Sequence, residues 1–206
     1  MASNTVTGQT VPADVDPQSG FRLPLPKRED LDEAGKRVYD TVADPKGGTI
    51  VGLRGPGGIQ LYSPQYAEHA RPLNRFLRYQ SGLGERVREL AILVTAREFN
   101  SRFEWAAHEP EALRAGVAAA IIDVIKHRKS TAGLDEADAV IIDFGREAFG
   151  AKSVSSATFA RALEQFGPER LVNLVGLMGN YAGTAILLAT FDMQLRPGET
   201  AILPVP

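Results

Sequence analysis

Apolar residues recur at helical spacing along most of this chain, and Gly, Pro and Asn separate the apolar segments. The pattern is helical almost throughout, and no strand pattern interrupts it. It predicts eight helical segments, over residues 29–43, 64–80, 85–99, 102–108, 117–129, 135–149, 156–166 and 169–193.

The segment from Glu85 to Phe99 differs from the others because it is apolar nearly all round. A helix of that kind is typical of the centre of a bundle. Asn100 and Ser101 end it and begin the next helix, which Pro110 is expected to close or kink.

Residues 44–58 form a glycine-rich loop that includes Gly47 and Gly48. Such a loop can hold a phosphate, but this one has neither the P-loop lysine pattern nor the Rossmann spacing. A plain connector or a lid is the expected reading.

A length of 206 residues fits one domain with an N-terminal extension. We expect a flexible polar arm at 1–20, a single helical domain at 21–196 and a short tail at 197–206. The arm lacks the basic and apolar regions of a secretory signal, and no apolar run approaches the length of a membrane span. A cytoplasmic protein that does not engage a membrane is therefore expected.

Composition excludes several classes of function. The net charge is −2 and the basic residues are scattered, which does not favour nucleic-acid binding. Because the chain has no cysteine, disulfides, thiolate chemistry and cysteine-ligated zinc are ruled out within it.

The strongest candidate chemistry lies at Glu104 and His108. Positions i and i+4 share one face of a helix, and Glu89 stands fifteen residues earlier on the apolar helix. An imidazole beside carboxylates makes a proton-transfer site, and the chain has only three histidines that can titrate near neutral pH.

Each of these residues also has a structural interpretation. The helical neighbours of Glu89 are apolar, so burial would raise its pKa, unless Arg86 or another arginine pairs with it. Ser101 and Glu104 fit a capping box, and a lone His108 is most often structural.

Two further possibilities stay open. One histidine and two carboxylates can bind iron or zinc, with His69 as the other contributor, although no metal ligand is assigned. His127 is expected at a solvated helix end. Five arginines are candidates for binding an anionic substrate: Arg54, Arg71, Arg75, Arg78 and Arg97.

The stretch from Leu83 to Gly116 resembles the carboxymuconolactone decarboxylase and alkylhydroperoxidase D family. Residues 88–93, 100–108 and 115–117 carry the resemblance, which extends more loosely over 22–193. Glu89 and His108 match the glutamate and histidine of the peroxidase branch. The two cysteine positions fall on Ser101 and Glu104, so disulfide-based peroxide reduction cannot run.

The resemblance implies an all-α antiparallel helical bundle that assembles as a homo-oligomer. It also implies a cofactor-free lyase acting on a small carboxylated lactone or an acid from aromatic degradation. Glu89, Glu104 and His108 would be catalytic, with Glu104 orienting His108 and Glu89 as the second proton carrier. The alternatives are another proton-transfer or hydrolytic reaction at the same site, and a non-catalytic helical oligomer that binds a small ligand or a partner protein.

Overall fold

The computed structural model describes residues 5–6, 9–46, 49–196, 198–199 and 203–204. They fall into two compact units, one within Met1–Leu73 and Ile186–Thr200, the other within Asn74–Ala185 and Ala201–Pro206. The elements are β1 (Thr5–Val6), β2 (Gln9–Thr10), η1 (Arg28–Asp30), α1 (Glu33–Ala43), α2 (Pro56–Gln60), α3 (Pro64–Tyr79), α4 (Glu85–Glu98), α5 (Arg102–Arg114), α6 (Ala119–Lys126), α7 (Glu136–Arg146), η2 (Glu147–Ala151) and α8 (Ser156–Thr190).

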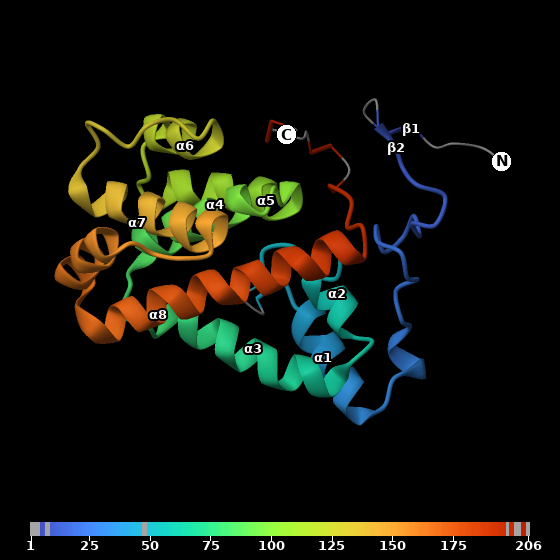
Figure 1. Cartoon of the computed structure of the whole chain (residues 1–206). Coiled ribbons are helices and arrows are strands. Elements are labelled where there is room, and N and C mark those ends of the chain that lie inside the picture. Colours follow the sequence, from blue (N-terminus) through green and yellow to red (C-terminus); the bar gives the residue numbers. More distant parts are fainter. Residues whose placement is uncertain (1–4, 7–8, 47–48, 197, 200–202, 205–206) are drawn as a thin grey trace. The chain divides into compact units, whose positions relative to one another are not determined.

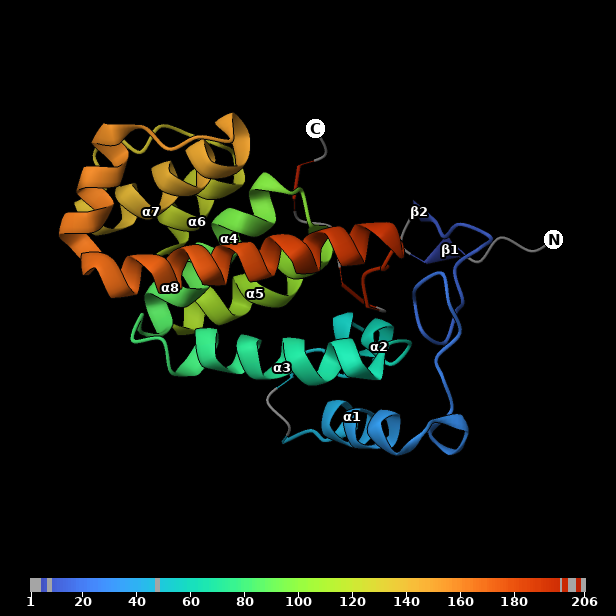
Figure 2. The ribbon, with the colours of Figure 1, turned by 60° about the horizontal axis from the view of Figure 1, so that its bottom comes forward.

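The second unit is built around α4, which α5, α6 and α7 contact (Figures 1 and 2). Ten consecutive residues of α4, Arg88 to Arg97, are buried, as expected from its apolar pattern. Gly145 lets α7 approach closely, because a Cβ there would lie 2.4 Å from Val94 Cγ1. The all-α fold is confirmed for the described residues, apart from the short antiparallel pair β1–β2.

The turn between α4 and α5 sets the geometry of the later site. Asn100 has a φ of 49°, in the left-handed region that Asn tolerates. The Ser101 N–H donates to Ala96 O and the Asn100 N–H to Arg97 O, which is a Schellman end. The chain therefore reverses within a few residues, and α5 packs back along α4.

Pro110 does not close α5, which was one of the two predicted effects of this proline, and the predicted end at His108 is wrong. The helix continues through it to Arg114. It ends where Gly116 takes a φ of 87° and Val117 N–H donates to Ala112 O. The prediction gave the proline too much weight, since a glycine in the left-handed region is the stronger stop signal here.

Helix α8 contains the expected break between two segments. Gly167 has a φ of 69° and precedes Pro168, so the helical conformation is interrupted there. Residues 171–190 carry no charged side chain. By length and composition α8 could cross a membrane, so the statement that no apolar run approaches that length is wrong. Core helices pass the same test, and Leu174 and Leu177 are fully buried in the core.

The first unit has a small core of its own, formed by Val38, Val42, Leu61 and Ala67. The glycine-rich loop is not a plain connector throughout, because α2 forms within it, with Pro56 at its first position. Gly47 and Gly48 lie outside the described residues.

The expected arm is described only in part, since residues 1–4 and 7–8 lie outside the described structure, as does most of the expected tail. Asp16 accepts hydrogen bonds from the backbone of Gln18 and Ser19, and Phe21 is fully buried. The division into arm, domain and tail stays a prediction. So does the homo-oligomer, although α8 exposes Val172, Val175 and Ile186.

Candidate active site

The site begins with a buried bond between α4 and α5. Glu89 Oε2 lies 2.7 Å from His108 Nδ1, and both side chains are almost wholly buried. The two residues are nineteen positions apart, and the tight turn at Asn100 and Ser101 brings them to the same level. A carboxylate at Nδ1 fixes the orientation of the ring and leaves Nε2 for chemistry.

A second partner holds the other oxygen of Glu89. Arg88 Nε donates to Glu89 Oε1 at 2.9 Å. The Arg88 guanidinium also donates to Arg78 O at 2.9 Å and to Glu85 Oε1 at 3.1 Å. The structural alternative for Glu89, a pair with Arg86 or another arginine, is confirmed through Arg88, whereas Arg86 itself pairs with Asp138.

Glu104 completes the set from the other side of the imidazole. Its Oε2 lies 3.5 Å from His108 Nε2, and its side chain is 6% exposed. The capping-box interpretation is wrong, because the Ser101 side chain makes no capping bond and its N–H is already used by Ala96 O. Because the Schellman bond uses the Ser101 N–H, Glu104 does not accept a hydrogen bond from it and does not cap the helix.

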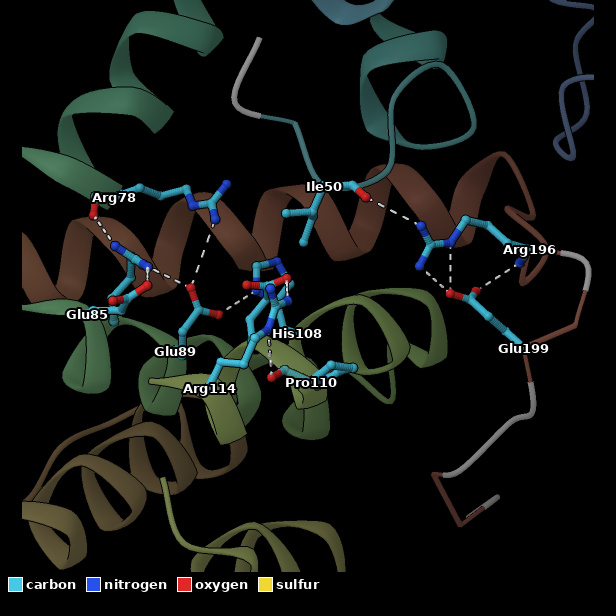
Figure 3. Close-up of polar contacts among 11 residues, drawn as sticks. Ile50, Arg78, Glu85, Glu89, His108, Pro110, Arg114, Arg196 and Glu199 are labelled. Atoms are coloured by element: carbon cyan, nitrogen blue, oxygen red, sulfur yellow. Dashed lines mark hydrogen bonds and ion pairs between the residues drawn. The ribbon is translucent and has the colours of Figure 1, made fainter. Parts of the chain in front are cut away.

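Tyr181 and Arg78 surround the same group. The ring of Tyr181, on α8, stands edge-on to His108 with 5.2 Å between centroids. Arg78, in the last turn of α3, places Nη2 3.9 Å from Glu89 Oε1. Figure 3 shows Arg78 and His108 reaching different oxygens of Glu89. Burial raises the pKa of Tyr181 well above its ordinary value, so the phenol stays neutral.

The two carboxyls have opposite protonation tendencies. Burial raises the pKa of Glu104, and the attraction of His108 and Arg78 does not offset it. Burial also raises the pKa of Glu89, but His108 and Arg88 outweigh it, and the pKa lies below its ordinary value. The raised pKa expected for an unpaired Glu89 is therefore wrong, because His108 and an arginine, Arg88, both pair with it.

Several other candidates lie apart from this cluster. His127 is half exposed at the end of α6, near Asp123, as expected. His69 is exposed on α3. Within the part of the chain that the structure describes, no group of three or more metal-binding side chains has the arrangement of a metal site.

Of the five candidate arginines, only Arg78 joins the cluster within its own unit. Arg75 is exposed, and Arg97 donates to Lys126 O. Arg54 and Arg71 belong to the other unit.

Sequence analysis missed Arg88 and Tyr181. Arg88 is an arginine other than Arg86, which the sequence analysis allowed as a partner of Glu89, but neighbouring residues on a helix point in different directions, so no sequence signal selects it. A signal for Tyr181 does exist, since it is a polar-tipped aromatic in a long uncharged segment.

Residues 64–142 match the carboxymuconolactone decarboxylase family. A search of curated proteins finds no match to this chain. The matched segment is shorter than the resemblance over 22–193, but it contains Glu89, Glu104 and His108, whereas Tyr181 lies beyond it. Over these residues, which make up less than half of the chain, the protein is similar to the carboxymuconolactone decarboxylase family.

Proposed function

We propose that this cluster is a cofactor-free proton-transfer centre, and that the protein is a carboxymuconolactone decarboxylase-like lyase. Its substrate would be a small carboxylated lactone or a related acid from aromatic degradation. One observation carries the proposal: a single buried imidazole has a carboxyl group at each nitrogen, Glu89 at Nδ1 and Glu104 at Nε2.

Glu89 would orient His108 rather than carry the transferred proton. It is the closer partner, at 2.7 Å, and its lowered pKa keeps it ionised. An ionised carboxylate at Nδ1 holds the proton on that nitrogen and stabilises the imidazolium when it forms. This exchanges the roles that the sequence suggested for Glu89 and Glu104.

Glu104 and His108 Nε2 would share the transferable proton. Burial favours the neutral acid form of Glu104, so it can donate near neutral pH. The bond between the ring carbon and the carboxylate carbon breaks, and its electron pair moves into the ring towards the lactone carbonyl. Carbon dioxide leaves, and Glu104 and His108 Nε2 deliver their shared proton to the ring carbon. A proton from water then replaces the one that the site has given up.

The same geometry would serve another proton-transfer or hydrolytic reaction. A purely structural role is less well supported, because burying two carboxyl groups and an imidazole costs several kcal/mol unless all are paired. Glu104 has no hydrogen bond shorter than its 3.5 Å contact with His108 in the described structure.

The test is turnover of small carboxylated lactones, followed by carbon dioxide release, in the wild type and in two histidine variants. His108→Ala should lower kcat/KM by about 10²–10⁴-fold, the usual contribution of a general acid or base. The matched control, His127→Ala, changes a half-exposed histidine and should leave turnover unchanged.

Circular dichroism must show that His108→Ala keeps the helical fold. Full turnover by a folded His108→Ala variant would refute the proposal. Turnover without carbon dioxide release, but still dependent on His108, would favour the alternative reaction at the same site.

A further inference from the structure

Arg78 brings to the cluster a buried guanidinium whose hydrogen-bonding capacity is largely unused among the described residues. Its side chain is 8% exposed, and its Nε is buried with no hydrogen-bond partner among the described residues. The nearest carboxylate oxygen, Glu89 Oε1, is 3.9 Å from Nη2, which is too far for a hydrogen bond. The guanidinium also lies over the Tyr79 ring, 5.0 Å from its centroid.

Arg88, the neighbouring buried arginine, shows the opposite condition. Its guanidinium donates to Glu89, to the carbonyl of Arg78 and to Glu85, so its donors point at protein groups in three directions. Glu89 in turn receives both Arg88 and His108 at hydrogen-bond distance. Glu89 therefore does not need Arg78, and holding Glu89 does not explain why Arg78 is buried.

A buried guanidinium with unused donors is unfavourable until an anion reaches it. The planar fork of arginine suits a carboxylate, which it can bind through two parallel hydrogen bonds. We propose that Arg78 binds a carboxylate of the substrate and holds the reacting carbon beside His108. This inference rests on the proposed function, since it uses the same site.

The surroundings of Arg78 support this assignment. Burial lowers its pKa, but the nearby Tyr181, Tyr79, Glu89 and Glu104 outweigh that effect and keep the guanidinium charged. Arg78 therefore lies within electrostatic reach of both carboxyl groups that flank His108. A carboxylate bound there would meet the proton donors of the site without crossing to another element.

The bound carboxylate would be one that the substrate retains. A carboxylate that leaves as carbon dioxide loses its charge in the transition state, so a strong ion pair to it would stabilise the ground state more. Arg78 is therefore suited to a second carboxylate, one that keeps its charge throughout.

The experiment is calorimetric binding to four proteins of a lactone with two carboxylates, γ-carboxy-γ-carboxymethyl-γ-butyrolactone, and of its analogue in which the carboxymethyl group is a neutral carboxamide. The four proteins are the wild type, Arg78→Gln, Arg78→Lys and the control Arg75→Gln, which changes an exposed arginine of the same helix. Arg78→Gln should weaken carboxylate binding about 10–100-fold, in line with a charge-assisted hydrogen bond, and leave carboxamide binding unchanged. Arg78→Lys should fall between, and Arg75→Gln should match the wild type.

Equal binding of the carboxylate by the wild type and a folded Arg78→Gln variant would overturn the inference. So would a wild type that binds neither compound, or one that binds the carboxamide as tightly as the carboxylate. If Arg78→Gln does not fold, Arg78→Lys provides the test, since it keeps the charge but not the planar guanidinium. Carboxylate binding by Arg78→Lys as tight as that of the wild type would then overturn the inference.

Binding and turnover by His108→Asn separate this inference from the proposed function. The variant should lose turnover but still bind the carboxylate through Arg78. Carboxylate binding that depends on Arg78, in a protein with no turnover of any lactone, would support the anion site and refute the lyase. Turnover that depends on His108 but not on Arg78 would support the lyase and refute the anion site at Arg78.

Discussion

Two buried carboxyl groups of the same unit, Asp138 and Glu104, are treated very differently by their surroundings. Asp138 is 2% exposed and receives two hydrogen bonds from Arg86, at 2.6 and 2.8 Å. Glu104 is 4% exposed, and its nearest polar partner in the described structure is His108 Nε2 at 3.5 Å. The first carboxylate is fully paired, and the second is not.

The difference separates stability from function. The Arg86 guanidinium also donates to Gly116 O, so this pair ties α4 to α7 and to the turn after α5. Glu104 makes no comparable pair with another helix in the described structure, since its printed contact is with His108 of its own helix. A protein keeps an imperfectly paired buried acid where its proton is useful, which is why Glu104 marks the site and Asp138 does not.

The largest expected effect comes from breaking the complete pair. Asp138→Asn should lower the free energy of unfolding by about 2–3 kcal/mol, near the lower end for buried pairs because Arg86 is itself partly exposed. Turnover should change little at temperatures where the protein stays folded. Urea unfolding measures the loss.

Glu136→Gln, on the same helix as Asp138, is the matched control, since the exposed pair of Glu136 with Arg161 of α8 should contribute less than about 1 kcal/mol. An Asp138→Asn variant as stable as this control would contradict the stabilising role of the Asp138–Arg86 pair.

The reverse pattern is expected at Glu104. Glu104→Gln keeps the shape and a hydrogen-bond donor but has no proton to give, so kcat/KM should fall about 100-fold. Stability should stay the same or rise, because a neutral amide replaces a buried acid. Paired measurements of turnover and urea midpoint check both. Loss of stability with full turnover would make Glu104 a structural residue like Asp138.

The smallest expected effect is on the pH dependence of stability. The raised pKa of Glu104 in the folded state means that its contribution is fully present below about pH 4.3, the ordinary glutamate value, and is lost as pH rises through the folded pKa. Wild-type protein should therefore lose stability relative to Glu104→Gln as pH rises above that value.

Urea midpoints of the two proteins between about pH 5 and about pH 9 test this. The pKa of Glu89 is lowered, so its contribution to stability is lost as pH falls rather than as pH rises. Glu89 is present in both proteins, so this contribution cancels in the difference. A constant difference across the range would contradict the raised pKa at Glu104.

Local patterns were sufficient for much of the fold. The all-round apolar segment 85–99 is the central helix α4, and the break at Gly167 separates two helical segments as expected. The relation of Glu104 to His108 also follows from sequence, because a spacing of four is a property of any helix. Pro110 failed as a stop signal because packing and a later glycine decided where α5 ends.

By itself, then, the sequence determined the longer helices, the central position of α4, the resemblance to the family over residues 64–142 and the pairing of Glu104 with His108. Only the tertiary structure decided that Glu89 meets His108 Nδ1, that Arg88 rather than Arg86 holds Glu89, and that Tyr181 stands against the imidazole. These contacts join residues on different helices or neighbours that point apart. Burial and charge partners act through such contacts, so the low pKa of Glu89 and the high pKa of Glu104 arise only once the helices have packed.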